Sequence, residues 1–320
     1  MIYESDALIL APLSGFTDAP YRRSARKCGC RYAFTEMVDA ASLTFAFERS
    51  KDLLLRYEDE EFLGVQLLGG NADHIKEAVE KLNAFDFDVL DFNLGCPVPK
   101  VAKKCAGAEL GLHYDEAIRC FDTVAKHSKF PVTAKLRILD VEDPEPTLKL
   151  CRGLVNCGAQ ALTVHGRVKK AFYSGTVHHH VIKAVHDEFP QIEVIANGGV
   201  KSVESYRQMK EATSCTRVML ATGAMGDPWL FRQLSDPENF TPPTFEEWRA
   251  IIEEQTQGMV ELYGPECAYR HARKIYHDYM KGRGFNGILR AAASATSCAG
   301  DLKAWLDMAA ESGVMPHEQK

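Results

Sequence analysis

The sequence lacks a long hydrophobic run: no apolar stretch approaches the ~20 residues that a membrane-spanning helix needs. Its start, MIYESDALILAPL, carries acidic residues where a secretory signal carries positive charge, so we expect a first strand there and no signal. It also lacks internal repeats of solenoid period and low-complexity tracts. With 46% hydrophobic and 26% charged residues, the composition is that of a globular protein and excludes a membrane-spanning, disordered or fibrous chain.

A large excess of charge of one sign is also absent. The chain has 38 Lys+Arg against 44 Asp+Glu, a formal net charge of −6. This mild acidity argues against a generally basic nucleic-acid-binding protein but is compatible with a local basic patch. The segment 270–290 is such a patch, because it contains six lysines and arginines and one acidic residue.

Cysteines at metal-binding spacing are missing too. The ten cysteines form no CxxC pair, and Cys28-Gly29-Cys30 has no second pair at zinc-finger spacing, so we predict no metal site. We expect reduced thiols, most of them small buried groups, and a cytoplasmic protein.

Short apolar runs alternate with segments of helical period along most of the chain. Eight runs are the expected strands: 7–13, 32–36, 62–68, 89–93, 132–137, 161–165, 193–197 and 217–221. Amphipathic segments between them include 72–83, 114–127, 146–156 and 202–211. This alternation predicts a parallel sheet buried on both faces. Eight units in about 240 residues favour an α/β protein of the (β/α)₈ TIM-barrel class.

A doubly wound open sheet is the structural alternative. It is disfavoured because no GxGxxG motif follows the first strand, which ends Ala11-Pro12-Leu13-Ser14-Gly15.

The pattern changes after residue 231. Residues 235–244 contain three prolines and no periodicity, as expected of a linker. From Phe245 onward the chain has helical character and no strand candidate. We therefore predict two domains, a barrel over 1–240 and an all-helical domain over 245–320.

Polar residues end most of the expected strands: Ser14, Glu36, Gln66, Asn93, Lys135, His165 and Asn197. The carboxyl ends of barrel strands carry the active sites of this fold. A buried parallel strand has no structural use for a terminal Lys, Gln or Asn, so these positions together predict a lined pocket.

Two loops rich in small residues follow the seventh and eighth expected strands. They are Asn197-Gly198-Gly199 and Ala221-Thr222-Gly223. Small residues let backbone N–H groups approach an anion, and these two loops form the usual phosphate site of the fold. The pair predicts a bound phosphate.

Two reactive side chains stand out on the same predicted face. Cys96, between Gly95 and Pro97 just beyond a strand end, is expected on a tight, exposed loop as a functional thiol. Lys135 is expected to point to the barrel mouth, where a cation would stabilise negative charge developing on a cofactor ring.

Seven motifs in order give the chain a family resemblance: APLSGFTD from Ala11, VQL from Val65, NLGCP from Asn93, AKLR from Ala134, TVHGR from Thr163, IANGG from Ile195 and GDPW from Gly226. The chain resembles the tRNA-dihydrouridine synthases, flavoenzymes with an FMN-binding barrel and a C-terminal helical domain. The resemblance runs from about Ala7 to Phe231, and beyond Phe245 it rests mainly on the basic segment.

The resemblance implies roles for the residues at the strand ends. The residues that would contact FMN are Pro12, Leu13 and Ser14 along its edge, Gln66 and Lys135 at the pyrimidine end, His165, and the phosphate loops Asn197, Gly198, Gly199, Ala221, Thr222 and Gly223. FMN reduced by NADPH would pass a hydride to C6 of a uracil base in tRNA. Cys96 would protonate C5 as general acid, a role that suits a thiol of pKa near ~8.5.

Substrate contacts are expected around the thiol and on the helical domain. A uracil in folded RNA must be extruded to react, and a cationic surface must hold the backbone. The residues expected to contact tRNA are Asn93, Arg137, Arg167, Lys103, Lys104, Arg270, Arg273 and Lys274, with Lys281, Arg283 and Arg290 extending the basic surface. The domains would thus be catalytic (1–240) and tRNA-binding (245–320) in a monomer.

The chain departs from the family pattern at two places. Ala221-Thr222 replaces a usual Gly-Arg, so the phosphate would depend on backbone N–H groups. Cys105 stands where an apolar residue is common; we expect it to face the core, with a second catalytic thiol as the alternative.

Two other functions remain open at this point. One is an FMN barrel acting on a free pyrimidine such as dihydroorotate, which leaves the basic helical segment unexplained. The other is a barrel that has lost its chemistry and only binds RNA, against which the presence of Asn93, Cys96 and Lys135 argues.

Overall fold

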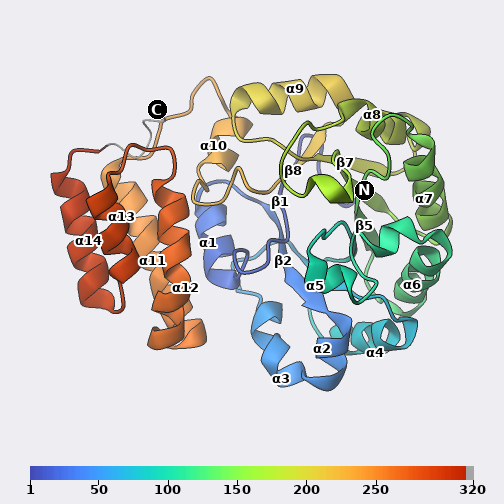
Figure 1. The fold of residues 1–320 in the computed structure, drawn as a ribbon, viewed down its shortest axis with the longest axis horizontal. Helices are drawn as coiled ribbons and strands as arrows, with labels where there is room; N and C mark the ends of the chain where they lie inside the picture. Colours follow the sequence, from blue (N-terminus) through green and yellow to red (C-terminus); the bar gives the residue numbers. More distant parts are fainter. Residues whose placement is uncertain (315–320) are drawn as a thin grey trace. The chain divides into compact units, whose positions relative to one another are not determined.

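Eight parallel strands close into a barrel (Figure 1). The computed structural model describes residues 1–314 of the chain. The strands follow one another around the barrel in chain order: β1 Leu8–Leu10, β2 Tyr32–Asp39, β3 Leu63–Leu68, β4 Val89–Leu94, β5 Val132–Arg137, β6 Ala161–His165, β7 Glu193–Asn197 and β8 Arg217–Leu220. Each overlaps one of the eight predicted strands, so the predicted (β/α)₈ barrel is confirmed.

Helices cover the outside of the strands. They are α2 Ala40–Phe45, α3 Phe47–Ser50, α4 Ala72–Leu82, α5 Pro99–Ala102, α6 Tyr114–His127, α7 Glu145–Asn156, α8 His179–Glu188 and α9 Val203–Thr213, with short 3₁₀ turns η1 Lys51–Leu54, η2 Leu110–Leu112 and η3 Lys169–Ala171. The apolar stripe of α4, including Ile75, Val79 and Leu82, is fully buried. Side-chain caps from Asn71 and Ser202 satisfy the first N–H groups of α4 and α9.

The barrel interior changes from apolar to polar along the strands. Near the amino ends, Ile9, Phe34 and Met219 belong to one buried apolar cluster. Further along β4, the row that begins with Val89 continues with Asp91 and Asn93, because alternate residues of a strand share a face. Polar side chains therefore gather inside the barrel toward the carboxyl ends of the strands.

A second compact unit comprises residues 16–30 and the chain from Thr222 onward. Its helices are α1 Ala19–Lys27, α10 Leu230–Ser235, α11 Phe245–Tyr263, α12 Pro265–Met280, α13 Gly287–Ala295 and α14 Ala299–Glu311. Its core contains Trp248, Tyr276 and Trp305. Between Phe245 and residue 314 the structure contains no strand, in agreement with the predicted helical character.

This unit begins earlier in the chain than the predicted helical domain and includes α1. The Tyr263 hydroxyl donates to Asp18 at 3.2 Å, and the Tyr21 hydroxyl donates to the Ala224 carbonyl. The Trp229 indole N–H also donates to Glu247, across the proline-rich segment, at 2.9 Å. The segment after β8 is thus fastened to helices on both sides of the predicted linker.

None of the helices within residues 1–314 is both long enough and apolar enough to cross a membrane.

Gly226 is held by steric contact with α12. It has φ +67°, and a Cβ there would lie 2.2 Å from the Asp278 carbonyl carbon. Gly264 has a similar φ of +75° with nothing within 4 Å. Gly264 combines this φ with ψ +157°, a conformation that essentially only glycine adopts, so we expect Gly264→Ala to cost roughly 1–3 kcal/mol of stability, the backbone term alone. Gly226→Ala should cost roughly 1–3 kcal/mol more through overpacking.

Tryptophan fluorescence during urea unfolding measures this difference, because Trp229, Trp248 and Trp305 are the only tryptophans and all lie in this unit. Equal unfolding midpoints for the two variants would contradict the steric explanation.

Candidate active site

A chain of buried hydrogen bonds links Asp91 to the backbone before Cys96. The Gln66 side-chain nitrogen donates to Asp91 at 2.7 Å, and the Asn93 side-chain nitrogen donates to the Gln66 oxygen at 2.7 Å. The Asn93 oxygen accepts the N–H groups of Gly95 and Cys96 at 3.0 and 2.9 Å. Since both ends of each amide are engaged, their orientations are fixed.

Asp91 begins this chain of hydrogen bonds and is 1% exposed. Burial raises the pKa of its carboxyl to about 6, while hydrogen bonds from Gln66 and Thr133 act in the opposite direction. Asp91 lies two residues before the NLGCP motif. The sequence did not predict it as a site residue, because its hydrogen-bond partners, Gln66 and Thr133, lie on other strands, β3 and β5.

Cys96 is buried, and the expectation of an exposed loop is wrong. Its side chain packs with Leu68, Val101 and Ala106 and is 9% exposed. The chain folds back over it through α5, and the Ala108 N–H donates to the Cys96 carbonyl at 2.9 Å. Burial raises the pKa of the thiol, with smaller opposing effects of hydrogen bonding and nearby cations. The thiol is therefore protonated at neutral pH.

Arg137 holds the loop that carries Cys96. It is 2% exposed, and its guanidinium donates to the carbonyls of Gly95 at 2.8 Å and Val168 at 3.3 Å. Its guanidinium carbon lies 5.6 Å from the centre of the Tyr173 ring. Tyr173 is 58% exposed. No strand-end pattern pointed to Tyr173, since it lies eight residues beyond β6.

Lys135 and Asn197 meet across the barrel interior. The lysine amine donates to the Asn197 side-chain oxygen at 2.9 Å, although β5 and β7 are not neighbouring strands. The Asn197 side-chain nitrogen donates to the Met219 carbonyl at 2.8 Å, which fixes the amide. Burial and then the charge of Arg137 lower the pKa of Lys135 to about 8.

His165 is neutral. Burial, followed by the charges of Lys135, Arg137 and Arg167, lowers its pKa to about 2. Its Nε2 accepts a hydrogen bond from Arg167 at 3.3 Å. Two glycines of positive φ, Gly198 and Gly199, directly follow β7, and a Cβ on Gly198 would lie 2.7 Å from the His165 ring. Backbone therefore approaches this ring as closely as only glycine permits.

The segment after β1 is positioned by Glu36, whose carboxylate accepts the Gly15 N–H. Pro12 and Leu13 are half-buried, and Ser14 is exposed. At the other end of the predicted cofactor set, Ala221 and Gly223 are half-buried and Thr222 is exposed.

The predicted basic residues near Cys96 lie at the surface. Lys103 and Lys104 are exposed, and Lys104 donates to Asp39 at 2.9 Å. Cys105 is exposed as well, so the expectation that it faces the core is wrong. Its φ of +49° and the close packing of its carbonyl against Gly70 set the backbone of the turn, and the side chain takes no part in the core.

The basic residues of the helical unit divide into two groups. Arg270 and Lys274 are exposed, with the Lys274 amine 4.3 Å from the Phe16 ring centre, whereas half-buried Arg273 donates to the Thr296 carbonyl at 2.9 Å. Arg283 is 5% exposed and forms an ion pair with Asp227 at 3.1 Å. Its predicted place on a cationic surface is wrong, because a buried charge requires a partner.

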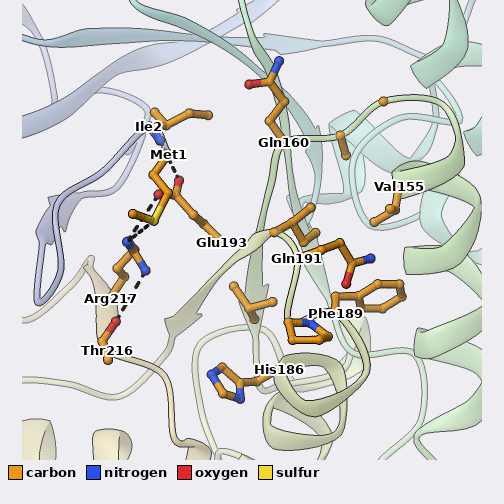
Figure 2. Close-up of a pocket in the computed structure, with 15 residues that line it drawn as sticks. Met1, Ile2, Val155, Gln160, His186, Phe189, Gln191, Glu193, Thr216 and Arg217 are labelled. Atoms are coloured by element: carbon orange, nitrogen blue, oxygen red, sulfur yellow. Dashed lines mark hydrogen bonds and ion pairs between the residues drawn. The ribbon is translucent and has the colours of Figure 1, made fainter.

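A separate pocket lies at the opposite, amino-terminal ends of the strands. Figure 2 shows Glu193 and Arg217, the first residues of β7 and β8, facing Met1 and Ile2. Glu193 accepts the N–H groups of Ile2 and Tyr3 at 3.1 Å each. These contacts tie down the N-terminus, and no predicted site residue lines this pocket.

Comparison with known proteins agrees with this geometry. The family model described as dihydrouridine synthase matches residues 9–312. The chain is 31% identical over 292 residues to "tRNA-dihydrouridine synthase B" of Pasteurella multocida, covering 90% of this chain and 88% of that protein. It is 32% identical over 279 residues to the protein of the same name from Pseudomonas aeruginosa (85% and 83% covered), and 31% identical to "Probable tRNA-dihydrouridine synthase" of Rickettsia bellii (87% and 86%). With its eight-stranded barrel, this chain belongs to the dihydrouridine synthase family.

Proposed function

We propose that this protein reduces the C5–C6 bond of specific uridines in tRNA to give 5,6-dihydrouridine, with FMN as cofactor and NADPH as reductant. The observation that carries the proposal is the hydrogen-bonded chain through Gln66 and Asn93, which fixes a protonated Cys96 at the carboxyl end of β4. The same end of the barrel holds Lys135 and a neutral His165.

The residues at this end fit a flavin mononucleotide. Gly198 and Gly199 have positive φ and no side chains; a Cβ on Gly198 would collide with the His165 ring, and one on Gly199 would lie 3.1 Å from Val177. A turn without side chains suits close approach of a phosphate to its N–H groups. A Cβ on Gly199 would lie 3.7 Å from the Arg167 guanidinium, so a cation stands beside this turn. Arg167 therefore suits a phosphate contact as well as the substrate contact predicted for it.

The ring of the cofactor would be met by polar groups of known orientation. The Gln66 side-chain nitrogen retains one hydrogen after donating to Asp91, and the Lys135 amine retains donors beyond the one used on Asn197. FMN, when bound, supplies the hydride that adds to C6 of uracil. Hydride addition leaves negative charge that requires a proton at C5, and the Cys96 thiol carries that proton.

RNA would reach this site with the target base extruded from its stack. The exposed cations Lys103, Lys104, Arg270 and Lys274 are the residues we propose for backbone contacts. All ten cysteines are free thiols, which favours a reducing compartment, so we propose a cytoplasmic protein. We also propose that it acts as a monomer.

The purified protein should release FMN. A phosphate turn without an adenylate-binding fingerprint predicts a mononucleotide, and mass spectrometry of the released cofactor identifies it.

Reduced enzyme should be oxidised by unmodified tRNA and not by free uracil or orotate, as followed by flavin absorbance. Release of FAD, or equal oxidation by a free pyrimidine, would overturn the proposed function.

Cys96→Ala should fold, bind FMN and be reduced by NADPH at the wild-type rate. Its single-turnover oxidation by tRNA should slow by about 10²–10⁴, the usual contribution of a general acid. Cys105→Ala is the matched control, since that thiol is exposed and should leave the rate unchanged. A wild-type rate in Cys96→Ala would remove this thiol from the mechanism.

Reduction of the flavin by NADPH should depend on pH through Lys135. Its pKa is lowered to about 8, so the amine is charged below pH 8 and loses its charge as the pH rises through that value. A cation favours the anionic reduced ring, so the rate should fall above pH 8. Lys135→Ala should be slower by about 10²–10³ at pH 7 and should lose this pH dependence. Lys76→Ala, at an exposed site on α4, should match wild type throughout.

A further inference from the structure

A shallow apolar groove lies on the same end of the barrel as Cys96, outside the site described above. It encloses about 400 Å³, and its lining includes Leu112, Asp140, Val168, Lys169, Lys170 and Phe172. These residues come from the segments that follow β4, β5 and β6. The groove therefore opens on the catalytic face, which is the face that a substrate strand must cross.

Two large apolar side chains of the groove are exposed to solvent. Leu112 is 50% exposed and Phe172 is 43% exposed. Phe172 also adopts φ +49° and ψ −111°, a conformation that a bulky side chain rarely takes. Strained residues of this kind gather at ligand-binding sites, where the surrounding structure holds them in place.

Arg137 links the groove to the loop that carries Cys96. Tyr173 follows Phe172 in the chain, and its ring lies against Arg137. Arg137 in turn donates to the carbonyls of Val168, in the groove wall, and of Gly95, next to Cys96. One buried guanidinium thus fixes the groove and the Cys96 loop relative to each other.

The charges around the groove suit a nucleotide. Lys170 is exposed at its edge, while Lys169 is paired with Glu109. The Asp140 carboxylate accepts the N–H groups of Asp143 and Glu142 at 3.0 and 2.8 Å, and these hydrogen bonds lower the pKa of its carboxyl. A cation on the rim suits a phosphate, and a carboxylate suits an exocyclic amino group of a base. The groove's volume of about 400 Å³ lies within the range of small-molecule sites, roughly 300–1,000 Å³.

We propose that this groove binds the nucleobase next to the target uridine in the substrate RNA, with the Phe172 ring as its stacking surface and Lys170 beside the neighbouring phosphate. The inference rests on the proposed function, because it takes the flipped uridine of an RNA strand as the group that reaches Cys96. Stacking on an aromatic side chain tolerates any base, and Asp140 adds a preference for a base that carries an amino group.

A double-mutant cycle tests this proposal. The substrates are an in vitro transcribed tRNA, whose reduced uridine is first mapped with the wild-type enzyme, and the same RNA with an abasic residue on the 5′ or the 3′ side of that uridine. The enzyme variants are Phe172→Ala, and Phe172→Gly, which relieves the backbone conformation and so keeps the fold. Phe172→Tyr should restore stacking, and Phe45→Ala removes an aromatic ring that is 74% exposed on α2.

We expect Phe172→Ala and Phe172→Gly to lower kcat/KM for tRNA by roughly 5- to 150-fold, the usual worth of one stacked base. Flavin reduction by NADPH should be unchanged, and Phe172→Tyr and Phe45→Ala should match wild type. With one of the two abasic RNAs, the kcat/KM of the wild-type enzyme should fall by a similar factor. The kcat/KM of Phe172→Gly should be no lower with that RNA than with the intact tRNA. Additive losses with both abasic RNAs, or a wild-type kcat/KM in Phe172→Gly, would overturn the groove assignment. A wild-type enzyme that reduces no tRNA uridine would instead overturn the proposed function, and the groove assignment with it.

Discussion

The active end of the barrel depends on one arrangement of buried amides. Gln66 and Asn93 lie inside a closed barrel, where a polar group without a partner is costly, so each must pair at both ends. The pairs they form run from Asp91 to the backbone of the Cys96 loop. Because neither amide can turn without leaving a donor or acceptor unpaired, the position of the thiol follows from the interior of the barrel.

Burial gives this end of the barrel its chemistry by disfavouring charge. It raises the pKa of the Cys96 thiol and of Asp91, and it lowers the pKa of Lys135 and His165. The thiol consequently keeps its proton and the imidazole stays neutral, while the lysine titrates near pH 8. Such a site can deliver a proton and stabilise a developing negative charge, which are the two requirements of adding hydrogen across a carbon–carbon double bond.

The turn at Gly226 and Asp227, which follows β8, packs against helical residues of the second unit. Gly226 packs directly against the backbone of α12, and Arg283 donates to its carbonyl at 3.2 Å while pairing with Asp227. These contacts explain why Thr222 and the residues after it group with the helices. They also account for a buried arginine in a segment whose composition predicted a cationic surface.

The sequence by itself determined the strand and helix pattern and the set of polar residues at the strand ends. Short apolar runs and segments of helical period are local patterns, so β5, β6 and β7 could be predicted to the residue. The polar ends of the strands followed from the same pattern. In the structure Asn93 is hydrogen-bonded to Gln66, and Lys135 is hydrogen-bonded to Asn197.

Only the tertiary structure decided which of these groups are buried and what they pair with. The residues flanking Arg137 and Arg283 in the sequence do not distinguish them from surface arginines. In the structure both are buried: Arg137 donates to two backbone carbonyls, and Arg283 pairs with a carboxylate, all from distant segments. Cys96 is covered and Cys105 exposed because the chain between them turns back over the first thiol. Burial and charge pairing depend on residues far apart in the chain, and the spacing of residues along a single segment carries no information about them.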